Sequence, residues 1–325
     1  DNLISYIVFF TLLAYMHGTN TTRKEESNAF YTKVLPEDSL RWVYIPSVVL
    51  LTIAMVYFVN VPALIANKTL IKSIQPQTGG PEKNLELFKK TLSLNSFGST
   101  EAIEQLIQTT VQINGGQFPD KVKQDFYNLS KEQIEKKIKE VPNDARYLVF
   151  AGSFFNRFDQ YDEALKYLNQ AIKESPTKQS IYYELGSSYL GKGDKQKMFE
   201  AFKTAYELKP SSDEARAIYA VGAIYTNNTE LLKELLPKLE QERIITDNRF
   251  LKAYSDVGNF ATVVSILNTR IQRDPKNTQN KLSLAATFAT MGEKAKAVAL
   301  LREVIAMEPK FKEQGEYYIQ QINNQ

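Results

Sequence analysis

Residues 145–178 read ARYLVFAGSFFNRFDQYDEALKYLNQAIKESPTK, and residues 179–212 read QSIYYELGSSYLGKGDKQKMFEAFKTAYELKPSS. Each segment contains two amphipathic stretches that are separated by a short polar turn and closed by a proline, Pro176 or Pro210. Proline ends the second stretch because it has no backbone donor and does not fit within a further helical turn. The two segments therefore predict two helix-turn-helix units in tandem.

The same pattern continues along the second half of the chain with a period of 34 residues. Prolines stand at positions 142, 176 and 210, and again at positions 275 and 309. The interval from Pro210 to Pro275 is 65 residues, three short of two periods, which indicates that one unit has been shortened. Residues 278–311 repeat the pattern well, residues 244–277 repeat it more weakly, and residues 213–243 form the short unit.

Small and large residues alternate at fixed places in these units. Gly152 and Gly186 occupy the same place, where two helix backbones must approach closely, and large residues such as Leu148 and Phe155 fill the space beside them. These packing positions and the 34-residue period resemble the tetratricopeptide repeat family. The resemblance implies an all-α fold in which residues 143–325 stack as an α-solenoid. Residues 310–322 are expected to form its closing helix, which covers the last apolar face.

Residues 68–142 connect this array to an apolar N-terminal region. The predicted linker, residues 68–83, contains the Gly79-Gly80 pair, which interrupts any helix. Residues 84–142 contain two amphipathic stretches around Ser96-Phe97-Gly98 and a lysine-rich one that ends at Pro142. We interpret residues 84–142 as degenerate helical repeats.

The second of two apolar segments, residues 42–67, contains no charged side chain. A helix of this length would extend about 39 Å, enough to cross a hydrocarbon core of about 30 Å. The segment therefore predicts a transmembrane helix. Asn60 and Pro62 near its end predict a kink or an early exit from the helix.

The first apolar segment, residues 2–22, is shorter, because its apolar part extends only from Leu3 to Met16. A buried helix or the core of a signal peptide has a similar pattern. No basic region precedes the segment and a second apolar segment follows it, which favours two spans joined by a loop, residues 23–41. The chain begins at Asp1 without a methionine, so we interpret it as part of a longer protein.

Basic residues in this loop predict its side of the membrane. The loop contains four of them: Arg23, Lys24, Lys33 and Arg41. The positive-inside rule places the loop in the cytoplasm and the repeats outside it, a bias that Lys68 and Lys72 weaken.

The composition gives little support for catalysis. The chain has one histidine, His17, and no cysteine, which excludes a Ser-His-Asp triad, a multi-histidine metal site and thiol chemistry within it. The net charge of +3 is spread among mixed charges, so no nucleic-acid partner is expected. We expect no catalytic residue, metal or cofactor in this chain.

The inner face of each first helix is the expected binding surface. Arrays of this family bind extended peptides there, and the candidate groove residues are Asn156, Arg157, Tyr183 and Ser187. A carboxylate clamp, which some family members use for chaperone tails, needs lysine and asparagine where this chain has Val149 and Ser153. We expect a protein or peptide partner, or a glycan, in the groove, and membrane lipid around the apolar segments.

Asp1-Asn2-Leu3-Ile4-Ser5-Tyr6, running into Val8-Phe9-Phe10, precedes a last span, a linker, helical units around residues 88–106 and the repeats. This arrangement resembles the C-terminal part of bacterial O-antigen ligase-like membrane proteins. The resemblance implies a polytopic enzyme of the bacterial inner membrane that transfers or polymerises lipid-linked glycan on the outer side. Its catalytic arginine and histidine would lie upstream, and this chain would be the membrane anchor and extracytoplasmic scaffold. The alternative is a non-enzymatic membrane-tethered scaffold that recruits envelope proteins.

Overall fold

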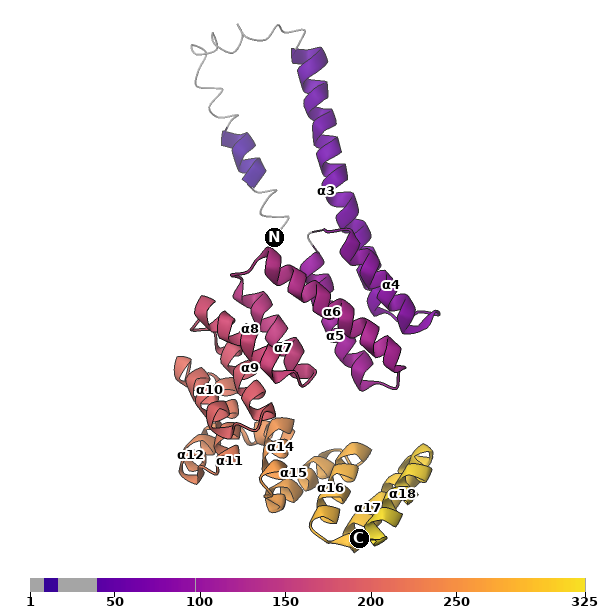
Figure 1. Ribbon diagram of the computed structural model, residues 1–325, viewed down its shortest axis with the longest axis vertical. Coiled ribbons are helices and arrows are strands. Elements are labelled where there is room, and N and C mark those ends of the chain that lie inside the picture. The colour runs from indigo at the N-terminus through magenta and orange to yellow at the C-terminus, as the bar shows by residue number, and fades with distance from the viewer. Residues whose placement is uncertain (1–8, 17–39, 97, 325) are drawn as a thin grey trace. The chain divides into compact units, whose positions relative to one another are not determined.

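The computed structural model describes residues 9–16, 40–96 and 98–324. All regular structure in these residues is helical (Figure 1), which confirms the all-α prediction for this part of the chain. The chain divides into two compact units, Asp1–Phe126 and Tyr127–Gln325. The boundary falls inside α6 (Asp120–Glu140).

The first unit is dominated by one long helix. A π-helical turn, Leu40–Tyr44, leads into α3 (Ile45–Ile74), which is followed by α4 (Gly80–Ser93), α5 (Ser99–Gly115) and the start of α6. Within the described residues, only the helical stretch Arg41–Ile74 is long and apolar enough to cross a membrane, and its most apolar part is not buried. Length and composition alone support a span here, so the membrane assignment stays a prediction.

The first predicted span, residues 2–22, is described only at residues 9–16, which are helical. The remainder of that span lies outside the described residues, as do His17 and the predicted loop up to residue 39. The two-span arrangement therefore stays a prediction.

The helix of the second apolar segment is longer than the sequence predicted. It does not exit near Asn60 and Pro62, and it continues to Ile74, so most of the predicted linker is helical and only residues 75–79 connect α3 to α4. Leu70 and Ser73 are buried in the first unit, where α3 packs against α4. The Nδ2 of Asn84 donates to the carbonyl oxygens of Ser73 at 2.6 Å and Gln75 at 2.7 Å. This packing and the hydrogen bonds to its last turn stabilise the extension.

The second unit consists mainly of antiparallel helix pairs (Figure 1). After α6 come α7 (Ala145–Arg157), α8 (Tyr161–Glu174), α9 (Gln179–Gly191), α10 (Lys195–Leu208), α11 (Asp213–Tyr225), α12 (Thr229–Leu235), α13 (Gln241–Thr246), α14 (Asn248–Asp256), α15 (Phe260–Arg273), α16 (Thr278–Thr290), α17 (Lys294–Met307) and α18 (Lys312–Asn324). The last of these lies where the closing helix was expected, and it buries Ile319 and Ile322 against Ala297 and Leu301 of α17.

One turn residue per unit shows the repeat period in the backbone. Asp159, Gly193, Asn227, Gly258 and Gly292 have left-handed conformations, with φ between 53° and 79°. Their spacing is 34 residues except between Asn227 and Gly258, where it is 31. The three-residue loss that the prolines indicated therefore lies between these two turns.

Close helix approach explains the small residues in the regular units. A Cβ atom added to Gly152 would lie 2.5 Å from Leu168, and one added to Gly186 would lie 2.1 Å from the ring of Phe202. Both distances are shorter than any van der Waals contact. The prediction that small residues permit this packing is confirmed at these two positions.

The shortened unit is less regular than its apolar pattern suggested. Pro237 lies in a 3₁₀ turn, Leu236–Lys238, that ends α12 after seven residues. The next first helix is split, because Asp247 has an extended backbone (φ −76°, ψ 113°) between α13 and α14. Its carboxylate accepts a hydrogen bond from the backbone N–H of Arg249 at 3.0 Å and so caps α14.

Candidate functional site

The four predicted groove residues differ in how free their side chains are. Arg157 and Ser187 are exposed, on α7 and α9, whereas Asn156 and Tyr183 are half-buried. The hydroxyl of Ser187 donates to the carbonyl of Tyr183 on its own helix at 3.0 Å. In the described part of the chain, no hydrogen bond or ion pair from a neighbouring repeat holds the side chain of Arg157 or Ser187.

Asn156 is already used within the array. Its Nδ2 donates to the backbone carbonyl and to Oε2 of Glu184, both at 3.0 Å, and its Oδ1 accepts from the hydroxyl of Ser188 at 2.7 Å. Ser188 is fully buried. These bonds connect α7 to α9, so Asn156 stabilises the stacking of two repeats.

Tyr183 lies at the edge of a polar network. Burial raises its pKa, the hydroxyl of Ser212 lowers it, and the charge of Glu214 raises it further, while the charge of Arg249 opposes that increase. The phenol therefore stays protonated in the neutral range. It lies beside the ion pairs that join α11 to α13 and α14.

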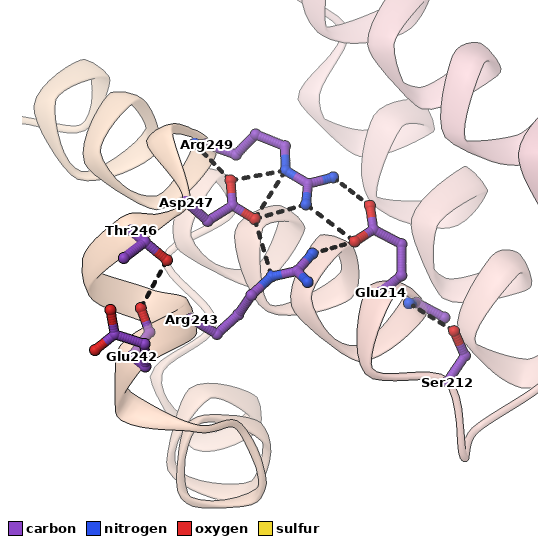
Figure 2. Close-up of polar contacts among 8 residues, drawn as sticks. Ser212, Glu214, Glu242, Arg243, Thr246, Asp247 and Arg249 are labelled. Atoms are coloured by element: carbon purple, nitrogen blue, oxygen red, sulfur yellow. Dashed lines mark hydrogen bonds and ion pairs between the residues drawn. The ribbon is translucent and has the colours of Figure 1, made fainter.

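Four charged residues form that network (Figure 2). Glu214, in the first turn of α11, accepts from Arg249 of α14 at 2.6 and 3.2 Å and also from Arg243 of α13. Asp247, between α13 and α14, accepts from Arg249 at 2.6 Å and from Arg243 at 3.3 Å. Two acids and two arginines thus connect the split helix to the preceding repeat.

The electrostatics of this network favour the charged forms of Glu214, Asp247 and Arg249. Hydrogen bonds from Arg249 lower the pKa of Glu214, with burial opposing and Arg243 contributing further. Burial raises the pKa of Asp247, but bonds from Arg249 and the charges of both arginines outweigh it and lower the value overall. Because each charge has an opposite partner, the network serves to hold helices together and offers no unpaired charge to a ligand.

Two adjoining cavities lie further along the array. The apolar cavity, of about 730 Å³, lies among α16, α17 and α18, and its lining includes Leu282, Leu301, Phe311 and Ile322. The polar cavity, of about 490 Å³, lies between α14 and α16 beside α15, and its lining includes Asn248, Arg270, Asn277 and Asn280. Gln279 and Ser283 line both cavities. We call the two together the C-terminal groove.

Arg270 is the distinctive side chain of the polar cavity. Its Nε donates to the carbonyl of Ile245 at 2.5 Å and its Nη1 to Oδ1 of Asn248 at 2.7 Å. Its Nη2 is buried without a hydrogen-bond partner. Burial lowers the pKa of this guanidinium, and the nearby charge of Asp247 offsets only part of the effect. Among the described residues that line the C-terminal groove, Arg270 alone carries a charge.

Sequence reasoning missed this groove, although two signals pointed to it. Leu251 and Arg270 stand at repeat positions where small residues are usual. Both line the polar cavity. A large or charged residue in place of a small one prevents close helix packing and leaves space between helices.

The described residues contain no group of three or more His, Cys, Asp or Glu side chains that could hold a metal ion.

The comparisons with known proteins support the repeat assignment. Residues 145–178 and 179–212 each match the model of the tetratricopeptide repeat family, within the boundaries that the sequence predicted. The sequence matches no curated protein. The chain therefore contains tetratricopeptide repeats at these residues.

Several solved structures share this type of helical fold. Yeast Tom70 is 18% identical, covering 75% of this chain and 50% of that one, with a TM-score of 0.44. A tetratricopeptide repeat protein from Parabacteroides merdae is 19% identical, covering 63% and 79%, with a TM-score of 0.45. YrrB, described as a TPR protein with an unusual peptide-binding site, is 18% identical, covering 54% and 92%, with a TM-score of 0.34.

Proposed function

We propose that this chain is a membrane-anchored scaffold whose repeats bind an extended segment of a partner protein in the C-terminal groove. The adjoining pair of cavities supports the proposal most directly. The apolar cavity suits a bulky side chain of the partner, and the amide side chains of the polar cavity suit its backbone. The shared residues Gln279 and Ser283 connect the two parts of the groove.

The C-terminal groove is a better candidate for the binding site than the groove that the sequence predicted on α7 and α9. Asn156 is occupied by contacts between repeats, and Tyr183 lies beside a fully paired ion network. Arg157 and Ser187 remain candidate contacts for a protein, peptide or glycan that extends beyond the C-terminal groove.

The membrane anchor in this proposal is the helical stretch Arg41–Ile74, which is long enough to span a bilayer. We place the chain in the bacterial inner membrane with its repeats on the extracytoplasmic side. The basic residues between the two apolar segments support this orientation.

The parent protein is proposed to be an O-antigen ligase-like enzyme that transfers or polymerises lipid-linked glycan. The sequence arrangement alone supports this finer assignment. In the alternative, the parent is a non-enzymatic scaffold that recruits envelope proteins. The gene sequence upstream of Asp1 separates them, because the enzyme requires many further spans with a large outer loop, and the scaffold requires none.

Photo-crosslinking in cells tests the binding proposal. A photoreactive residue at Gln279, in the groove, should give one defined adduct with a partner protein. The matched control is Glu230 on α12, a highly exposed side chain outside the groove, which should give none. Adducts of equal yield at both positions, or none at Gln279, would contradict the proposal.

Protease accessibility tests the orientation. Protease added to intact spheroplasts should remove the repeats, cutting first at residues 75–79 between α3 and α4. Repeats that resist until the membrane is opened would place the array in the cytoplasm. That result would remove the support for the ligase-like assignment.

A further inference from the structure

The guanidinium of Arg270 lies in an environment that lacks an anion. Its two hydrogen bonds go to neutral oxygens, those of Ile245 and Asn248, and its Nη2 has no partner. A half-buried cation without a counter-ion is unfavourable, because desolvation is not repaid by an opposite charge. A ligand that supplies a negative charge would remove this cost.

The nearest acid cannot supply that charge. Asp247 is bound by Arg249 and Arg243, so its carboxylate already has two cationic partners. Releasing it to Arg270 would leave those two arginines with one anion, Glu214, between them. Asp247 therefore affects Arg270 only through the electrostatic field of its negative charge.

The amides around Arg270 also favour a ligand that accepts hydrogen bonds. The Oδ1 of Asn248 accepts from Arg270, and the Oδ1 of Asn277 accepts from the backbone N–H of Asn280 at 3.0 Å. With their oxygens occupied, both side chains present Nδ2 donors. Donors thus gather around a cation, which is the environment that binds carboxylates.

We propose that the polar cavity binds the carboxylate of an Asp or Glu side chain in the partner segment. This inference rests on the proposed function and specifies its ligand: an extended acidic peptide with a bulky apolar residue close to the acid. The apolar residue occupies the adjoining cavity lined by Leu282, Leu301 and Phe311. The carboxylate accepts hydrogen bonds from Arg270 and from the amides of Asn248 and Asn277.

Peptide display on the full chain in detergent tests this inference. The peptides of one random library have no free C-terminal carboxylate, and those of a second library have one. From the first library, the wild-type chain should enrich sequences with Asp or Glu near a bulky apolar residue. In an enriched peptide, changing the acid to its amide should weaken binding to the wild-type chain roughly tenfold to a hundredfold, as for a lost hydrogen-bonded charge.

Protein variants give an independent measurement. Arg270→Gln should weaken binding of the enriched peptide by the same factor. The Tm of this protein variant should stay unchanged or rise, because an unpaired buried charge is removed. The matched control is Arg273→Gln, an arginine on the same helix that pairs with Glu242 and lies outside the groove lining. It should bind like the wild type. A lower Tm with unchanged binding would give Arg270 a structural role and overturn the inference.

The remaining outcomes separate the inference from the proposed function. Enriched peptides without an acidic requirement would overturn the carboxylate assignment and leave peptide binding intact. Enrichment only from the library with free C-termini would overturn the assignment to a side chain. Enrichment of no sequence from either library would contradict both proposals.

Discussion

The regular repeats, residues 145–212, and the irregular stretch, residues 213–277, differ in the contacts that hold neighbouring helices together. In the regular repeats, Gly186 allows Phe202 to lie directly against a helix backbone. In the irregular stretch, a loss of three residues accompanies a split helix. Ion pairs of Glu214 connect that helix to α11, and those of Asp247 connect its two halves. The difference shows that ion pairs supplement the apolar packing where the repeat register breaks, and that a groove opens there beside Arg270.

Removal of Asp247 should have the largest effect on this comparison. Asp247→Ala deletes the cap of α14 and leaves Arg243 and Arg249 with one anion between them. The side chain of Asp247 is only 12% exposed, so the loss should be about 2–4 kcal/mol of unfolding free energy. Urea denaturation monitored by circular dichroism measures it. Glu230→Ala, which removes an exposed pair with Lys233, is the control and should leave the midpoint unchanged.

Substitution of Gly186 tests the other side of the comparison. Gly186→Ala places a methyl group against the ring of Phe202, and overpacking of this kind costs about 1–3 kcal/mol. Gly115→Ala is the control, because nothing lies within 4 Å of its added Cβ. Close packing predicts a loss of stability in Gly186→Ala but not in Gly115→Ala, and an equal change in both variants would contradict it. Thermal denaturation separates the two cases.

The smallest predicted effect is a difference in acid sensitivity. Glu214 and Asp247 have folded-state pKa values below their ordinary ones, so the stability they contribute is present above an unfolded pKa of about 4 and is lost as the pH falls through the folded values. The wild-type urea midpoint should therefore fall more steeply between neutral and acidic pH than that of Glu214→Gln. Parallel curves would mean that the network does not couple protonation to folding.

The sequence was sufficient to predict the repeats, because packing between neighbouring helices in a repeat depends on residues at a fixed spacing. Gly152, Gly186 and the prolines define that spacing locally. The shortened unit was also visible, as a deficit of three residues. The split at Asp247 was not, because an aspartate is tolerated within a helix and the break depends on its contacts with Arg243 and Arg249.

The sites were harder to predict, because a side chain's freedom depends on neighbours distant in the sequence. Asn156 was expected to face a ligand, yet it pairs with Glu184 and Ser188 of the next repeat. The predicted linker failed for the same reason, since contacts between α3 and α4 stabilise helix where the local pattern indicated coil. Arg270 stands at a repeat position where small residues are usual, but its missing hydrogen-bond partner is a property of the folded array.

Hydrogen exchange of the full chain tests most directly whether the ion network holds the irregular stretch as part of the array. In the wild type, the amides of α14 and α15 should be protected to a degree similar to those of α9 and α10. In Asp247→Ala, exchange should accelerate across α13, α14 and α15 and stay unchanged in α7 and α8. Equal acceleration throughout the repeats, or no change near α14, would contradict the account.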